Sequence, residues 1–73
     1  MSVIKNQYTA IIKKEDEWWI GWIEEIPGVN CQEASRDELM MSLKTTLAEA
    51  IEFNRQDSLL HAGNSYEEEK IAL

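Results

Sequence analysis

The stretch that most constrains the fold of this chain is residues 18–29, which contains all three tryptophans and the only proline. It begins with six aromatic, β-branched or glycine residues in a row and reaches a Pro-Gly pair at Pro27 and Gly28. This pattern predicts a β-strand followed by a turn. Aromatic side chains bury about 150–250 Å² each, so this strand holds much of the apolar surface that the chain can bury.

A glycine in the middle of this strand, Gly21, indicates the close approach of another backbone, and we expect a helix to lie on it. Because side chains alternate along a strand, Trp19 and Ile23 share the helix side with Gly21. The opposite face has nothing else in a small chain to cover it, so it is our main candidate interaction surface. It carries Trp18, Ile20 and Trp22.

Length and composition favour a protein that needs a partner. We expect a single domain over residues 1–73, with a core from residues 8–56; a domain of this size buries only about 60% of its surface. One cysteine, Cys31, allows no internal disulfide, and one cysteine with one histidine do not suggest a metal or cofactor site. Stability is therefore expected from self-association, as a dimer or tetramer, or from a protein partner.

The charge balance favours a basic protein partner. Fourteen acidic residues against seven basic ones give a formal charge of −7, and the cations are scattered along the chain. Direct binding of nucleic acid is not expected, because phosphates would be repelled. Solubility alone is the competing explanation for the acidic balance. No stretch is apolar enough to cross a membrane and no secretory signal is visible, so we expect a cytoplasmic protein with a reduced cysteine.

Flanking patterns predict a three-stranded meander followed by one helix. Residues 8–13 alternate as a first strand, with Tyr8, Ala10 and Ile12 toward the helix, and residues 14–17 predict a loop longer than two residues. Residues 29–33 predict a short third strand. Ser35 and Glu38 form a capping box at the start of a helix that we expect to end near residue 56.

The expected helix carries one apolar stripe that should lie over Gly21. Its members are Leu39, Met40, Leu43, Leu47, Ala50 and Ile51. Met41 is expected at the edge of this core, and Phe53 is expected to seal the core at the end of the helix. Residues 57–65 predict a loop. Residues 66–73 predict either a fourth strand at the sheet edge or a solvated acidic tail.

No group of residues in the sequence suggests catalysis. The neighbouring carboxylates Glu24 and Glu25 lie at a turn, and residues 67–69 are three glutamates in a polar segment, so no apolar pocket raises a pKa. The single histidine, His61, has no visible partner for acid–base or nucleophilic chemistry. We therefore expect a protein that is not an enzyme.

The order of these motifs resembles the HicB family of antitoxins, in the short form that has only the N-terminal HicB-like domain. The similarity covers about residues 8–55: a tyrosine-led first strand, an aromatic second strand that runs into Ile26-Pro27-Gly28, a short third strand and a capped helix. The resemblance implies a β-β-β-α-β fold of the partial ribonuclease-H-like kind, that is, an α+β protein with a three- to four-stranded, mainly antiparallel sheet and one packed helix.

The resemblance also implies a function. Members of this family bind HicA, a small basic toxin that cleaves mRNA, and mask its active site; they commonly form dimers or tetramers. The alternative is a homo-oligomeric structural or regulatory domain without a toxin. In either case the Trp18, Ile20 and Trp22 face would make the contact. Candidate electrostatic contacts are Glu24, Glu25, Glu67, Glu68 and Glu69, although for any one of them a solvated position is the competing reading.

Overall fold

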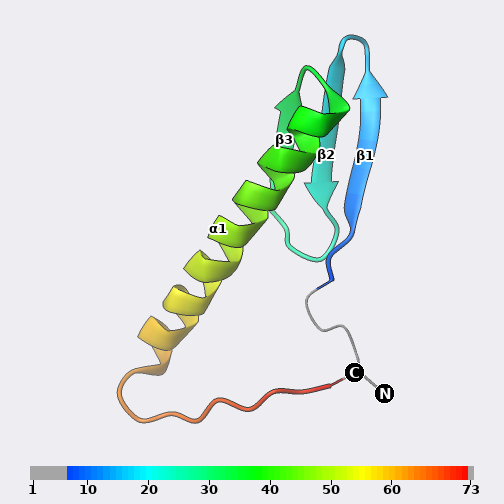
Figure 1. The fold of residues 1–73 in the computed structure, drawn as a ribbon. Helices are drawn as coiled ribbons and strands as arrows, with labels where there is room; N and C mark the ends of the chain where they lie inside the picture. Colours follow the sequence, from blue (N-terminus) through cyan, green and yellow to red (C-terminus); the bar gives the residue numbers. More distant parts are fainter. Residues whose placement is uncertain (1–6, 73) are drawn as a thin grey trace.

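The computed structural model describes residues 7–72, which form a three-stranded antiparallel sheet and one helix (Figure 1). The elements are β1 (Ala10–Glu15), β2 (Trp18–Ile23), β3 (Asn30–Glu33) and α1 (Arg36–Ala62). The strands lie in the order β1-β2-β3, and the helix crosses one face of the sheet. The predicted α+β class, with a meander followed by a helix, is confirmed. None of the described residues forms a helix that is both long and apolar enough to cross a membrane.

The turn between β1 and β2 is tighter than the sequence suggested. Glu15 pairs with Trp18, so only Asp16 and Glu17 connect the two strands, and the prediction of a longer loop is wrong. The backbone of Asp16 has φ 55°. Aspartate tolerates this left-handed conformation better than most residues, which explains how a two-residue turn forms without glycine. As a result β1 extends to Glu15, two residues beyond its expected end.

The turn predicted at Pro27 and Gly28 is present. Gly28 has φ 92°, a conformation that glycine adopts without strain. The N–H of Ile23 donates to the carbonyl of Val29 across this loop at 3.1 Å. The loop therefore returns the chain beside β2, and β3 begins at Asn30.

Gly21 is the point where the helix meets the sheet, as predicted. A Cβ atom built on Gly21 would lie 3.0 Å from the carbonyl oxygen of Ile11, 3.1 Å from Cδ1 of Leu43 and 3.2 Å from Cδ2 of Leu39. These distances are shorter than ordinary van der Waals contacts, so only glycine fits without displacement. Gly21 stands opposite Ile12 on β1 and Cys31 on β3, which places it in the centre of the sheet.

The core is small. Among residues 7–72, four hydrophobic side chains are buried, with no more than 5% of any of them exposed: Ile23, Val29, Leu39 and Leu43. Partly buried neighbours surround them, among them Trp19, Leu47 and Ala50. Helix α1 packs on β2 and β3, so the helix side of β1 is covered only in part.

The helix starts at the predicted cap. Ser35 has an extended backbone, with φ −135° and ψ 160°, and its Oγ accepts a hydrogen bond from the N–H of Glu38 at 3.1 Å. The same hydroxyl donates to Oε1 of Glu38 at 3.0 Å. Asp37 and Glu38 add negative charge in the first turn, where the helix dipole favours it.

The helix continues well past its predicted end. It reaches Ala62, so residues 57–62 are helical and the loop predicted for residues 57–65 is confined to its last residues. Twenty-seven helical residues span about 40 Å, whereas a six-residue strand spans about 20 Å. Figure 1 shows the second half of α1 projecting beyond the sheet. The radius of gyration, 15.5 Å, exceeds the value of about 11 Å expected for a compact domain of this length.

This overhang changes the surroundings of several apolar residues. The stripe that faces the sheet turns polar after Ala50, since Asn54, Asp57 and His61 follow at helical spacing. Phe53 is 68% exposed and does not seal the core, and Met40 is 37% exposed and does not belong to it. The prediction for Phe53 fails because the sheet does not extend to that part of the helix. The prediction for Met40 fails because α1 packs on β2 and β3 and leaves β1, which lies beside Met40, partly uncovered.

Residues 64–72 form neither helix nor strand. The acidic-tail alternative therefore describes residues 66–72, and the fourth strand is not formed there; residue 73 lies outside the described residues. The long helix provides the reason. After the turn and bend at residues 64 and 65, seven residues can span about 23 Å, and Figure 1 shows them returning from the helix end toward the sheet.

We predict that Gly21→Leu destabilises the fold, because the added side chain overlaps Ile11, Leu39 and Leu43. Overpacking of this kind costs about 1–3 kcal/mol, which in a domain of this size lowers Tm by roughly 5–20 °C. Ala48→Leu adds a similar change on the exposed side of the helix and should leave Tm nearly unchanged. Equal thermal stability of the two variants, measured by circular dichroism, would contradict the packing of α1 on Gly21.

Candidate protein-interaction surface

The sheet face opposite α1 is an open apolar surface formed by β1 and β2. The strand register pairs Ile11 with Trp22 on this face, and Ile20 and Trp18 follow along β2. Trp18 is 47% exposed and Trp22 is 38% exposed, while Ile11 and Ile20 are half-buried. The structure therefore places the predicted residues Trp18, Ile20 and Trp22 together. We call them, with Ile11, the open face.

Polar and charged residues border the open face. Lys13 stands opposite Ile20, and its Nζ lies 3.1 Å from the carboxylate of Glu15. On β3, Gln32 stands opposite Ile20 and Asn30 opposite Trp22. An apolar centre rich in aromatic residues, with a polar border, is the usual composition of a protein–protein contact.

The shape of the molecule explains why this face is uncovered. The shortest dimension of the molecule is 15 Å, which leaves room for one sheet and one helix but for no third layer. The helix occupies the Gly21 side. The alternation of the strand residues therefore leaves the tryptophans at positions 18 and 22 on the outer side.

Glu25 has a structural role that the sequence did not reveal. Its Oε1 accepts the backbone N–H of Thr9 at 2.7 Å, and its Oε2 accepts the hydroxyl of Thr9 at 2.7 Å. The carbonyl of Thr9 in turn accepts the N–H of Glu24 at 2.9 Å. Glu25 thus ties the loop after β2 to the residue before β1. Because these bonds favour the charged carboxylate, they lower the pKa of Glu25 below its ordinary value of 4.5.

Glu24 is the neighbouring carboxylate, and it differs from Glu25. It is exposed at the end of β2, and within residues 7–72 its side chain makes no hydrogen bond or ion pair. Of the two glutamates predicted at this turn, Glu24 is therefore the one available for an external contact.

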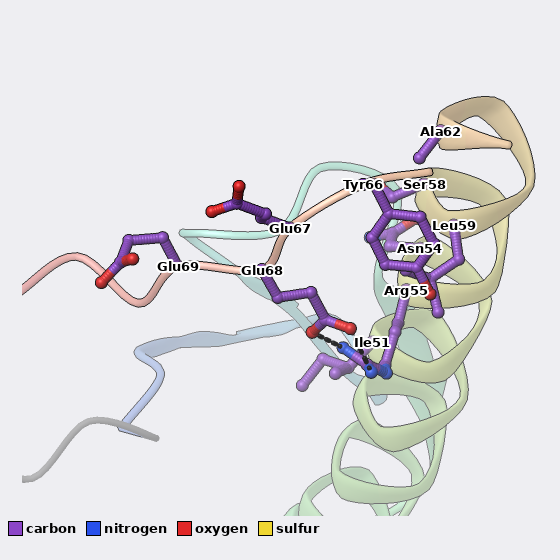
Figure 2. Close-up of a pocket in the computed structure, with 10 residues that line it drawn as sticks. All are labelled: Ile51, Asn54, Arg55, Ser58, Leu59, Ala62, Tyr66, Glu67, Glu68 and Glu69. Atoms are coloured by element: carbon purple, nitrogen blue, oxygen red, sulfur yellow. Dashed lines mark hydrogen bonds and ion pairs between the residues drawn. The ribbon is translucent and has the colours of Figure 1, made fainter. Parts of the chain in front are cut away.

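Of the three glutamates in the tail, Glu68 is likewise bonded to another described residue, whereas Glu67 and Glu69 are not. Glu68 forms a double hydrogen bond with the Arg55 guanidinium, with distances of 3.1 and 3.2 Å, and this fastens the tail to α1. This contact lowers the pKa of Glu68 and raises that of Arg55. Figure 2 shows Glu67 and Glu69 pointing away from Arg55.

The tail and the helix border an open hollow of about 580 Å³, which is lined by Ile51, Leu59, Tyr66 and polar side chains (Figure 2).

An apolar groove beside β1 was missed by the sequence analysis. It has a volume of about 320 Å³ and lies where the helix leaves β1 uncovered. It is lined by Tyr8, Ala10, Ile23, Met40, Met41, Leu43, Lys44 and Leu47. The helix-side placement of Tyr8 and Ala10 was predicted, but the groove depends on which strands α1 covers, and the sequence does not show this.

Every clear pKa shift among the described residues stabilises the charged form of a side chain. The three groups with clearly shifted pKa values are Glu25, Arg55 and Glu68, and each shifts toward its charged form. None of these shifts prepares a side chain to accept or release a proton near neutral pH. Among residues 7–72, no three side chains of the His, Cys, Asp or Glu types lie close enough together to hold a metal ion.

The fold and this surface together define a small α+β protein with a meander, one packed helix and an open aromatic sheet face. Searches against protein-family models, curated proteins and solved structures find no match to the chain.

We predict that the contribution of Glu25 to stability depends on pH. Because its pKa is lowered in the folded state, the contribution is complete above about pH 4.5 and is lost as the pH falls through the lowered pKa. Glu25→Gln should therefore lower Tm at neutral pH, and its difference from the unmodified protein should shrink in acid. Glu24→Gln is the matched control and should change Tm little. A difference for Glu25→Gln that is the same at neutral pH and at about pH 3 would contradict the role of Thr9.

Proposed function

We propose that this chain is a protein-binding module of the antitoxin type, which neutralises a small basic ribonuclease of the HicA kind by covering its active site. The observation that carries the proposal is the open face, where two tryptophans remain 47% and 38% exposed in a chain of net charge −7. Exposed tryptophans in the centre of a surface are typical of residues that contribute most of the binding energy in protein contacts.

The charges near the open face support a basic partner. Glu24 is exposed at one end of β2, and the turn at the other end contains Glu15, Asp16 and Glu17. Acidic groups at both ends of an apolar surface attract a basic protein and orient it during encounter. The three strands and the helix follow the order implied by the similarity to HicB-like domains, whereas the last strand of that order is not formed among residues 7–72. In this proposal the protein acts in the cytoplasm, takes no part in catalysis and binds no nucleic acid itself.

A homo-oligomeric domain without a toxin is the second candidate. It is favoured by the small core, because the four buried hydrophobic side chains among residues 7–72 are few for a domain that folds alone. In that case the open face would be covered by another copy of the chain, and a basic partner would not alter the assembly.

The proposal is tested by mixing the purified chain with a HicA-type ribonuclease, best one encoded beside it. We expect light scattering to show a complex heavier than either protein alone, and RNA cleavage by the ribonuclease to stop. If no HicA-type ribonuclease binds and the mass of the chain alone stays that of an oligomer, the second candidate replaces the antitoxin.

We predict that Trp22→Glu weakens this binding by at least about 30-fold, since replacing a central aromatic residue in a contact costs roughly 2 kcal/mol or more. Leu60→Glu places the same charge at an exposed apolar position on the overhang of α1, far along the helix from the sheet. It should bind as the unmodified protein does. Equal affinities of the two variants, measured by titration calorimetry, would remove the open face from the proposed contact.

A further inference from the structure

The outer edge of β1 is the best-defined surface that the proposed function does not use. β1 is the first strand in the order β1-β2-β3, so one side of its backbone has no strand partner among the described residues. An exposed edge of this kind can accept an additional strand. The apolar groove lies directly beside it, between Ala10 and the helix residues Met40 and Leu43.

Two adjacent lysines make one part of the β1 edge basic, just before the acidic residues at positions 15–17. Lys13 and Lys14 are neighbours in the strand and both are exposed. Lys14 lies on the helix side with Ala10 and Ile12, and Lys44 lines the groove on the same side. A strand that pairs here must therefore offer carboxylates at one end and an apolar side chain at the other.

The tail of the same protein has this pattern. Residues 66–72 form neither helix nor strand and are not paired to any strand. Ile71, which is 81% exposed, follows Glu67 by four residues and Glu68 by three. Laid antiparallel to β1, the tail can place Ile71 opposite Ala10, Glu68 opposite Lys13 and Glu67 opposite Lys14.

Three of the five opposed pairs in this register match in charge or polarity, whereas Glu69 opposite Ile12 and Lys70 opposite Ile11 do not. Side chains of directly opposite residues point to the same side of a sheet, so Ile71 and Glu67 would point to the helix side with Ala10 and Lys14. Ile71 would then enter the groove, while Glu68 and Lys13 would meet on the outer side. The opposite direction would place Ile71 against the lysines, where it fits neither the charge nor the groove.

The tail cannot pair in this register with β1 of the same copy of the chain. It leaves the helix beyond the sheet and returns toward the end of β1 at which Ala10 lies (Figure 1). From there it could run only parallel to β1, with its last residues, and not its glutamates, toward Lys13 and Lys14. A second copy of the chain has no such constraint.

We propose that two copies of this protein associate by exchanging tails, each adding residues 67–71 as an antiparallel strand to the edge of the other's β1. Glu68 leaves Arg55 in this exchange and takes Lys13 instead. The exchange gives up two exposed pairs, Arg55 with Glu68 and Lys13 with Glu15, and forms one between Glu68 and Lys13. Because exposed pairs of this kind contribute little to stability, the change of partner has little effect on the balance. The free energy of association comes from the backbone hydrogen bonds and from Ile71 in the groove.

Charge reversal tests this assembly. Variant A carries Lys13→Glu and Lys14→Glu, and variant B carries Glu67→Lys and Glu68→Lys. Each variant alone would place like charges opposite each other at both exchanged strands, so we expect a mass of 8.5 kDa by light scattering where the unmodified protein shows twice that value. Mixed together, A and B restore opposite charges at both strands, and we expect a dimer with one chain of each.

Two controls accompany this test. Glu49→Lys with Glu52→Lys makes the same change in net charge as variant B at exposed positions of the helix, and it should remain a dimer. Trp22→Glu should also remain a dimer, which separates this proposal from the proposed function of the open face. Circular dichroism confirms that each variant is folded.

Three results would overturn the proposal. The first is an unmodified protein that is monomeric at all concentrations, the result also expected if the tail pairs with its own β1. The second is that A and B each keep the dimeric mass by themselves. The third is a dimer that is lost in Trp22→Glu but not in A or B, which would assign self-association to the open face.

Discussion

The contact between Gly21 and the side chains of Leu39 and Leu43 determines the arrangement of the whole molecule. With no Cβ at position 21, the helix settles directly on β2, and the distances to Leu39 and Leu43 leave no space for a larger residue. The position of the helix then decides which strands are covered. It packs on β2 and β3, and this leaves β1 with a free edge and a groove.

The same contact also determines which side chains lie on each face of the sheet. Because strand residues alternate, the side chains next to Gly21 in sequence, Ile20 and Trp22, must point away from the helix. Among residues 7–72, 27 are used in one helix and the three strands form one sheet, so these residues provide no third layer over the tryptophans. The open face is thus a consequence of how the core is built, and any protein that binds there completes a layer that the chain lacks.

Local patterns were sufficient to predict most of the fold and part of the candidate surface. Strand alternation placed Trp18, Ile20 and Trp22 on one face, and the capping box placed the start of the helix. The predicted end of the helix was wrong because the polar residues after position 56 were interpreted as a loop, although no glycine or proline interrupts residues 36–62. The binding of Glu25 to Thr9 and the groove beside β1 depend on contacts distant in sequence, which periodicity does not encode.

The overhang of α1 has a consequence for how this protein can change during evolution. Past Ala50 the helix carries none of the four buried side chains of the core, so its length is not tied to the core. Whole turns can be added or removed there without disturbing the packing on the sheet. Such changes would alter only the distance at which the tail emerges. Insertions and deletions in this half of the helix are therefore a route by which related chains could acquire different modes of assembly while keeping one fold.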